Sequence, residues 1–402
     1  MLNSFFIAGF PGTTRVPRNG RRVEQAETCG HQRFYAQDYV RARKLGLQVA
    51  RESAQWPAIE RVAGHYDFSF VRRRIHCARA QGVQLIWTLL DGGWPADLDV
   101  MRPVFVQRFA AYARAFARLL RDQEVKDPVV VPINEIGPLA RAGGELAHVF
   151  PFLEERGLEL RCQLVRATVA AVDAMREIIP EIRVMYVEPL SHVAPHPFHP
   201  EDSDAAESMR REQFAVFDML SGRSWPQLGG REHHLDLLGV SHYLASQYYY
   251  AGPKHPGKMI NPQAAEWRRL SDMLTEVGRR YTCPLLLAAT GHDGAGRAAW
   301  LRYVCREVQH ATTRGTAIEG VCVQPIVDCA APQFEARSAN GLWGAADEEG
   351  ERSVDMWLAK ELREQQRTFE RLSRLSPTLI RSATEPDVAE RARIASNRAL
   401  DA

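Results

Sequence analysis

The sequence predicts a single (β/α)8 barrel of the TIM type, and three observations support this fold class. Eight apolar runs of strand length recur along the chain, stretches with helical spacing separate them, and no G-x-G-x-x-G motif follows the first run. Runs that are apolar on both faces are typical of parallel strands that helices cover. Without the glycine-rich motif, the closed barrel is favoured over an open, doubly wound sheet.

The expected strands and helices can be placed by residue range. The eight strands are expected at 5–10, 47–53, 83–90, 129–135, 182–189, 235–243, 284–290 and 318–328. The clearest helix is 103–122, where one face carries Phe105, Phe109, Tyr112, Phe116 and Leu119. A second helix is expected over 160–179. We therefore expect one catalytic domain, 1–375, followed by a polar, Ala- and Arg-rich tail, 376–402.

Composition excludes several classes of partner. The 402 residues are 45% hydrophobic and 25% charged, and 51 Lys and Arg balance 49 Asp and Glu, so no electrostatic footprint for nucleic acid exists. No apolar stretch is long enough to span a membrane, and the N-terminus does not resemble a signal peptide. Seven scattered cysteines without a C-x-x-C pair favour a reducing, cytoplasmic location. We expect no nucleic-acid or membrane partner, and a homo-oligomer is left open.

Polar residues end several of the predicted strands. In a (β/α)8 barrel the active site lies at these C-terminal strand ends. Carboxylates next to aromatic rings suit a sugar, whose hydroxyl groups need acceptors and whose C–H faces stack on rings. We therefore expect a sugar-binding site that draws on Arg51, Asp91, Asn134, Glu135, Glu188, Tyr243, Trp94 and Trp343. For Glu188, a structural salt bridge is nearly as good an explanation as a contact with a sugar hydroxyl.

Six segments in register resemble family 1 glycoside hydrolases, in particular a divergent, short bacterial branch. They are ARESAQWPAIERVAGHYDFS (50–69), GVQLIWTLLDGGWP (82–95), PINEIG (132–137), LDLLGVSHY (235–243), PLLLAATG (284–291) and GVCVQPIVD (320–328). The resemblance covers about residues 5–366. It implies a retaining β-glycosidase that acts on a small-molecule glycoside or oligosaccharide, with no metal or organic cofactor.

The resemblance also implies roles for individual residues. Glu135 is expected to be the general acid/base, and Asn134 the donor to the sugar 2-hydroxyl. Arg51 and Tyr243 match the residues that steady the nucleophile in its charged form. Asp91 and Gln324 stand at sugar-binding positions where the family usually has His and Trp. The Gln324–Pro325 peptide bond is expected to be cis, because the family usually has a cis bond there.

The pattern breaks at the nucleophile, because Ala289 occupies its position and a methyl group cannot attack an anomeric carbon. Three explanations are open. The chain is a deliberately disabled enzyme, a natural sugar-binding pseudoenzyme, or a glycosidase or transglycosidase in which a displaced carboxylate attacks. For the last, the candidates are Asp293, Asp91 and Glu188.

One histidine-rich stretch contains side chains of the type that bind zinc. His192, His196 and His199 follow the fifth expected strand, but three prolines among them prevent helical ligand spacing. A loop that faces the substrate is the favoured interpretation.

Overall fold

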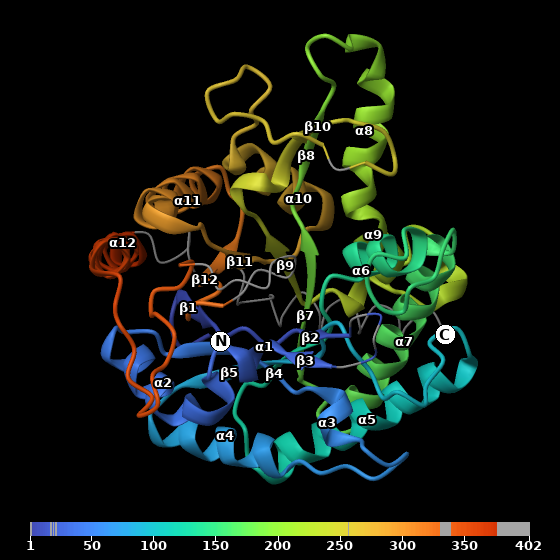
Figure 1. The fold of residues 1–402 in the computed structure, drawn as a ribbon, viewed down its shortest axis with the longest axis vertical. Coiled ribbons are helices and arrows are strands. Elements are labelled where there is room, and N and C mark those ends of the chain that lie inside the picture. Colours follow the sequence, from blue (N-terminus) through green and yellow to red (C-terminus); the bar gives the residue numbers. More distant parts are fainter. Residues whose placement is uncertain are drawn as a thin grey trace, which may run out of the picture.

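A computed structural model describes residues 2–375 except 17, 19, 21, 256 and 330–338. Eight parallel strands form a closed barrel in which each strand pairs with the next along the chain and the last returns to the first (Figure 1). The strands are β1 (Phe6–Gly9), β4 (Val49–Ser53), β5 (Gln84–Leu90), β6 (Val129–Ile133), β7 (Arg183–Pro189), β9 (Leu237–Ser241), β11 (Leu285–Thr290) and β12 (Ile318–Val323). The predicted (β/α)8 barrel and the order of its strands are confirmed.

Helices surround the barrel (Figure 1). The longer ones are α2 (His31–Lys44), α4 (Ser69–Ala80), α5 (Pro103–Asp122), α7 (Gly157–Arg176), α10 (Leu270–Tyr281), α11 (Arg297–Thr313) and α12 (Met356–Leu375). Short helices are α1 (Gln25–Thr28), α3 (Trp56–Ile59), α6 (Ile136–Leu139), α8 (Ser203–Arg211) and α9 (Ala215–Leu220). No helix in the described ranges is long and apolar enough to cross a membrane. The predicted tail, 376–402, lies outside the described residues.

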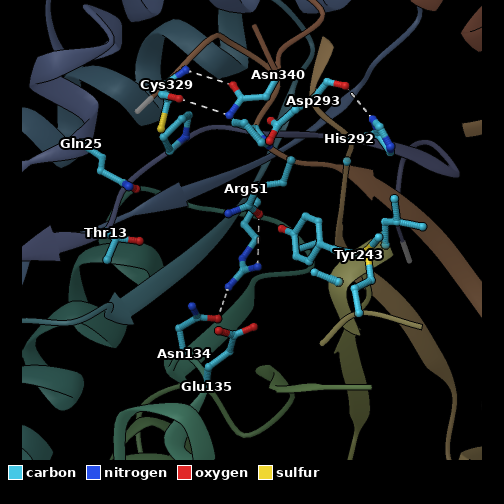
Figure 2. A pocket seen from close by; sticks show the side chains of 18 residues that line it. Thr13, Gln25, Arg51, Asn134, Glu135, Tyr243, His292, Asp293, Cys329 and Asn340 are labelled. Carbon is cyan, nitrogen blue, oxygen red and sulfur yellow. Dashed lines mark hydrogen bonds between the residues drawn. The ribbon is translucent and has the colours of Figure 1, made fainter. Parts of the chain in front are cut away.

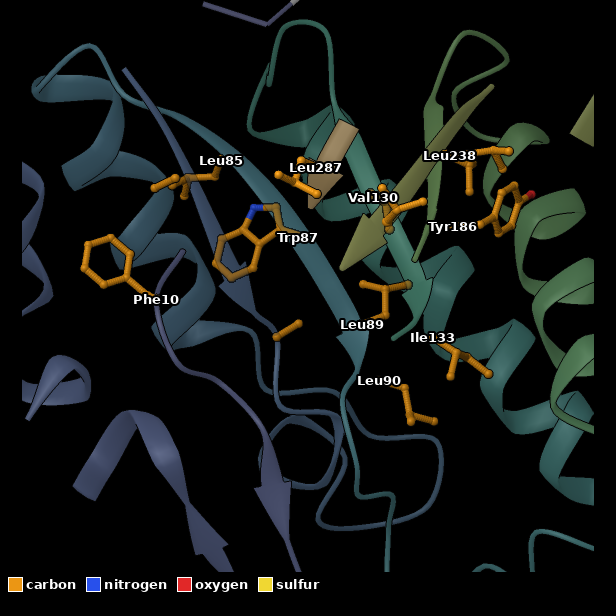
Figure 3. Close-up of a cluster of buried hydrophobic side chains, with 14 of the residues drawn as sticks. Phe10, Leu85, Trp87, Leu89, Leu90, Val130, Ile133, Tyr186, Leu238 and Leu287 are labelled. Atoms are coloured by element: carbon orange, nitrogen blue, oxygen red, sulfur yellow. The ribbon is translucent and has the colours of Figure 1, made fainter. Parts of the chain in front are cut away.

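Successive residues of a strand point to opposite faces of the barrel wall, and this alternation divides the core in two. Ile86, Val131 and Met185 belong to a small cluster inside the barrel. Their neighbours Trp87 and Tyr186 belong to the larger cluster between the strands and the helices, part of which Figure 3 shows. On each strand, every second residue therefore points into the barrel, as Ile86 does on β5 and Met185 does on β7. The inward-pointing residues near the C-terminal strand ends face the mouth of the barrel.

The helix α5 forms as its apolar spacing predicts. Its buried face includes Phe105, Phe109, Tyr112 and Phe116, and Pro103 stands in its first turn, where a missing N–H costs no hydrogen bond. Trp56 from α3 packs against this face, with its ring stacked on Tyr112 at 5.3 Å between centroids. The predicted second helix, 160–179, is observed as α7, which begins three residues earlier and ends at Arg176.

One excursion lies outside the barrel. The strands β8 (His192–Ala194) and β10 (Gln247–Tyr249) form a two-stranded parallel sheet, and with α8 they stand away from the barrel at the top of Figure 1. A second small pair, β2 (Thr14–Arg15) and β3 (Val23–Glu24), precedes α2. Both excursions interrupt a strand–helix connection on the side of the C-terminal strand ends.

A buried network of charges joins α2 and the segment before α12 to the barrel wall. His31 contacts Asp38 Oδ2 through Nδ1 and Glu52 Oε1 through Nε2, both at 2.8 Å. Arg352 donates to both oxygens of Asp38, and Arg74 donates to Glu52. Burial opposes charge on His31, but Glu52 and Asp38 outweigh this effect and raise the pKa of the imidazole. Every charge in this network therefore has an opposite charge in direct contact.

Candidate functional site

A cavity of about 520 Å³ opens at the C-terminal ends of the barrel strands (Figure 2). Such a cavity is where the active site of a (β/α)8 barrel lies. Of the residues that the sequence predicts for the site, it is lined by Arg51, Asn134, Glu135, Tyr243, Ala289, Asp293 and Gln324. The structure thus brings together residues from five different strands or the segments that directly follow them.

Glu135 lies at the turn from β6 into α6. Its φ of 50° places it in the left-handed region, which is uncommon for a residue other than glycine. Its carboxyl group accepts a hydrogen bond of 2.5 Å from Ser241 Oγ, at the end of β9. Burial raises the pKa of Glu135, and the Ser241 hydrogen bond only partly opposes this effect. A carboxyl group with a raised pKa is suited to donate a proton.

Arg51 is buried, with its guanidinium at the bottom of the cavity. In Figure 2 it lies between the Asn134–Glu135 pair and Tyr243. Its Nη2 donates to Asn134 Oδ1 at 2.6 Å, and its Nη1 donates to the carbonyl oxygen of Ala288 at 3.1 Å. The side chain is thereby fixed between β6 and β11, next to the position of the expected nucleophile.

Asp91 stands one hydrogen bond behind the cavity and does not line it. Its Oδ1 accepts from Asn134 Nδ2 at 3.2 Å, and its Oδ2 accepts from Thr13 Oγ1 at 3.1 Å. Burial raises the pKa of Asp91, while Arg51 opposes this effect. Asp91 therefore orients the amide of Asn134, so that the Asn134 oxygen faces Arg51.

Ala289 reaches the cavity because the pairing of β11 is irregular. A register shift between Leu287 and Ala289 brings Ala289 opposite Ser241 of β9. Residues opposite each other in parallel strands point to the same side, and Ser241 contacts Glu135. The methyl group of Ala289 and the carboxyl group of Glu135 therefore belong to one cavity.

Tyr243 and Gln324 also line the cavity. Gln324 Oε1 accepts from Arg51 Nη1 at 3.4 Å, and the Gln324–Pro325 bond is cis, as the sequence predicted. Burial raises the pKa of Tyr243. The phenol is therefore neutral at physiological pH and can donate a hydrogen bond into the cavity.

Glu188 lies outside the cavity lining, on the helix-facing side of β7. Its neighbour Val187 points into the barrel, so alternation turns Glu188 the other way. Its carboxyl group accepts from the backbone N–H of Gly137, at 3.0 and 3.2 Å to its two oxygens. A Cβ atom on Gly137 would meet Glu188 Oε2 at 2.6 Å, so a larger residue there would displace the carboxyl group. Glu188 therefore supports the segment after Glu135 and is not among the residues that line the cavity.

The tryptophans that the sequence placed near the site do not line the cavity. Trp94 is fully buried, with its ring against Phe105 and Phe150. Trp343 is 2% exposed, and its backbone bridges to Val327 and Val354. Both rings pack in the core, so the expected aromatic platforms are corrected to core residues.

Asp293 lies at the rim of the cavity and is exposed. It follows β11, and its carbonyl oxygen is 2.6 Å from His292 Nδ1. Asp293 and Glu135 are the carboxyl groups among the described lining residues. Of the three candidates for a displaced nucleophile, only Asp293 reaches the cavity.

Several lining residues were missed by the sequence analysis. Thr13 and Gln25 come from the connection after β1, and Met259 and Asn340 come from long loops. None of them ends an apolar run, so no pattern marked them. The described residues contain no group of three or more His, Cys, Asp or Glu able to hold a metal ion, so His192, His196 and His199 do not form one.

Comparisons with known proteins find similarity in fold but none in sequence. No family model matches the chain, and no curated protein matches it. Among solved structures, a family 1 β-glucosidase from Thermotoga maritima has a TM-score of 0.69 at 16% identity, covering 84% of this chain and 87% of that one. The same kind of enzyme from this organism, in complex with isofagomine lactam, gives 0.71 at 17% over 91% and 98%. The AHE enzyme from Alicyclobacillus herbarius gives 0.72 at 17%, also over 91% and 98%. The chain is therefore similar in fold to family 1 β-glucosidases over most of its length, in line with the resemblance seen in the sequence.

Proposed function

We propose that this chain is a divergent relative of the family 1 glycoside hydrolases whose cavity binds a β-glycoside, with a general acid but without the usual nucleophile. Glu135 is the general acid/base, and Asn134 and Tyr243 hold the sugar. Arg51 lies next to position 289, where the family has its nucleophile. The observation that carries the proposal is that Glu135, after β6, and Ala289, in β11, line the same cavity. In this form the chain binds glycosides and does not hydrolyse them by double displacement.

The physical argument is that a retaining glycosidase needs two carboxyl groups about 5–5.5 Å apart. Glu135 has the raised pKa that an acid requires. Its partner position at Ala289 holds a methyl group. Ser241 links the two, since it donates to Glu135 and pairs with Ala289. A carboxylate restored at Ala289 would also lie beside Arg51, which would keep it ionised.

The test measures binding and hydrolysis of a panel of aryl β-glycosides by the unaltered chain, Ala289→Glu and Ala289→Gln. The Gln variant has the shape of the Glu variant without its charge. We expect binding without turnover by the unaltered chain and by Ala289→Gln. Ala289→Glu should gain turnover of several orders of magnitude, the scale lost when a nucleophile is removed. Adding Glu135→Gln to Ala289→Glu should then remove most of this turnover for substrates with poor leaving groups. No glycoside binding by any variant would refute the proposal.

A second candidate is hydrolysis or transglycosylation by a displaced nucleophile, and it rests on the presence of Asp293 in the cavity lining. Its exposed loop position makes accurate placement difficult, and poor placement of a nucleophile is costly for rate. If the unaltered chain turns over aryl glycosides and Asp293→Asn abolishes this turnover, Asp293 is the nucleophile. Equal rates for the two chains would exclude this role.

A further inference from the structure

Arg51 is a buried cation without a carboxylate in contact. Three arginines are buried among the described residues: Arg51 at 4% exposure, Arg74 at 2% and Arg352 at 7%. Arg74 forms an ion pair with Glu52 at 2.7 Å, and Arg352 forms one with Asp38 at 2.8 Å. Within the described chain, Arg51 has no such partner, although a buried charge is costly unless an opposite charge compensates it.

Neutral oxygens satisfy the hydrogen bonds of Arg51 but not its charge. The acceptors are the side-chain oxygens of Asn134, Gln324 and Thr88 and the backbone oxygen of Ala288. The hydrogen bonds of the acids Asp91 and Glu135 go to Asn134, Thr13 and Ser241 and not to Arg51, and burial raises the pKa of both acids. The charge of Arg51 therefore remains available to a group that enters the cavity.

Ala289 directly follows one of the acceptors of Arg51 and lines the same cavity. Arg51 Nη1 donates to the carbonyl oxygen of Ala288, and the next residue lines the cavity with only a methyl group. Arg51 and Ala289 both line the same 520 Å³. A carboxylate that enters there can replace Gln324 Oε1, whose contact with Nη1 is long at 3.4 Å, and a charged acceptor forms the stronger hydrogen bond.

We propose that Arg51 binds a carboxylate on the Ala289 side of the cavity. The ligand is then either an acidic sugar, such as a uronic acid, or a neutral sugar with a free small carboxylate beside it. The choice of a sugar rests on the proposed function, whereas the carboxylate contact rests on the burial and contacts of Arg51. The carboxylate takes the place that the side chain of an acidic residue at position 289 would fill.

The first test compares the binding of D-glucuronate, D-glucose and acetate to the unaltered chain by calorimetry. We expect glucuronate to bind at least about tenfold more tightly than glucose. Ala289→Glu should abolish this preference, because its own carboxylate occupies Arg51, and Ala289→Ser, which leaves the space open, should keep it. If acetate binds alone and glucuronate has no advantage over glucose, the free carboxylate is the source. If neither acid binds better than glucose, the proposal is overturned.

The second test needs no ligand and separates this proposal from the glycoside-binding one. Ala289→Glu should melt at a higher temperature than Ala289→Gln at neutral pH, because only the former supplies a charge to Arg51. Acetate should raise the melting temperature of the unaltered chain above that in sodium chloride at equal ionic strength, and should not raise that of Ala289→Glu. Equal melting temperatures for the two variants, with no effect of acetate, would refute the carboxylate site. If the melting temperatures follow this prediction but no sugar binds, the carboxylate site is supported and the glycoside site is refuted.

Discussion

Glu188 is a carboxyl group that burial keeps protonated next to the proposed acid. Burial raises its pKa to about 8, and the charge of Glu135 adds to this effect. The backbone N–H of Gly137 opposes it without restoring the usual value. At neutral pH Glu188 is therefore mostly protonated, and it adds little negative charge next to Glu135.

Substitution of Glu188 by Gln should change how stability depends on pH. In the unfolded chain the carboxyl group ionises near 4.5, but in the folded chain it does so only near 8. Stability is thus fully present below the unfolded pKa and is lost as the pH rises to the folded value, by about 1.4 kcal/mol per pKa unit. Gln keeps an oxygen for Gly137 and does not titrate. Between pH 5 and 8, the free energy of unfolding should fall more for the unaltered chain than for Glu188→Gln.

The measurement is urea unfolding at several pH values, and the control is Glu348→Gln at an exposed position. The control should follow the unaltered chain at each pH. Parallel curves for Glu188→Gln and the unaltered chain would show that Glu188 titrates normally.

At the scale of elements, strand parity explains which predicted site residues reach the cavity. Arg51 has the same inward orientation as Val49 on its strand, whereas Glu188 follows the inward-facing Val187 and points outward. The apolar runs were long enough to locate each strand, but a run that is apolar on both faces does not reveal which face is inward. The register shift at Ala289 is a further feature that no sequence pattern marks.

The loops limited the prediction for a different reason. Strand ends could be located because apolar runs stop there, and Glu135 and Asn134 were found in this way. Thr13, Gln25 and Met259 lie on connections whose conformation depends on tertiary contacts. The sequence of these connections shows no hydrophobic periodicity. The fold and the residues at the bottom of the cavity were therefore predictable, and its rim was not.

The packing of α5 gives a prediction at the scale of one element. Phe109 is fully buried and contacts Trp56 and Tyr112. Phe109→Ala should lower the free energy of unfolding by about 3–5 kcal/mol, since it removes a buried ring and leaves a cavity. The control on the same helix is Val104→Ala, at 44% exposure, which should change it by less than about 0.5 kcal/mol. Similar losses for both, measured by urea unfolding, would contradict the packing described.

At the scale of the whole molecule, the network around His31 fixes the segment before α12 to the first half of the barrel. Asp38 is at its centre, in contact with His31, Arg41 and Arg352. Burial opposes ionisation of Asp38, but His31 and Arg352 outweigh it and lower the pKa. The pKa of Glu52 is lowered too, since Arg74 and His31 outweigh its burial. The network thus joins segments that are 314 residues apart in the sequence.

Substitution of Asp38 by Asn should destabilise the chain by about 3–5 kcal/mol, because it leaves Arg352 buried without its counter-charge. Because the pKa of His31 is raised on folding, His31 stabilises the folded chain below pH 6.5. This contribution is lost as the pH rises through the pKa of His31 in the folded chain. Because the pKa values of Asp38 and Glu52 are lowered on folding, the two carboxylates stabilise the folded chain above pH 3.8 and pH 4.5. This contribution is lost as the pH falls through their pKa values in the folded chain. The loss in Asp38→Asn should therefore be largest from about pH 5 to 6.5.

The matched control is Glu351→Gln. Glu351 pairs with Arg41 at 3.1 Å in the same region, but its side chain is 73% exposed. An exposed pair contributes at most about 1 kcal/mol, and salt screens it. Unfolding curves of the two variants across this pH range should differ clearly. If both lose the same small amount, the buried network does not stabilise the fold.

Closure of the barrel also constrains the order in which the chain can be completed during synthesis. Phe6 of β1 pairs with Val321 of β12, so the first strand obtains its second neighbour only after more than three hundred residues have been added. Until then one edge of β1 and its apolar side chains lack their partner, and an open strand edge invites pairing with other chains. A ribosome-bound chain that stops before residue 318 should therefore aggregate or bind chaperones. A longer chain, in which β12 has emerged from the ribosome, can close its sheet.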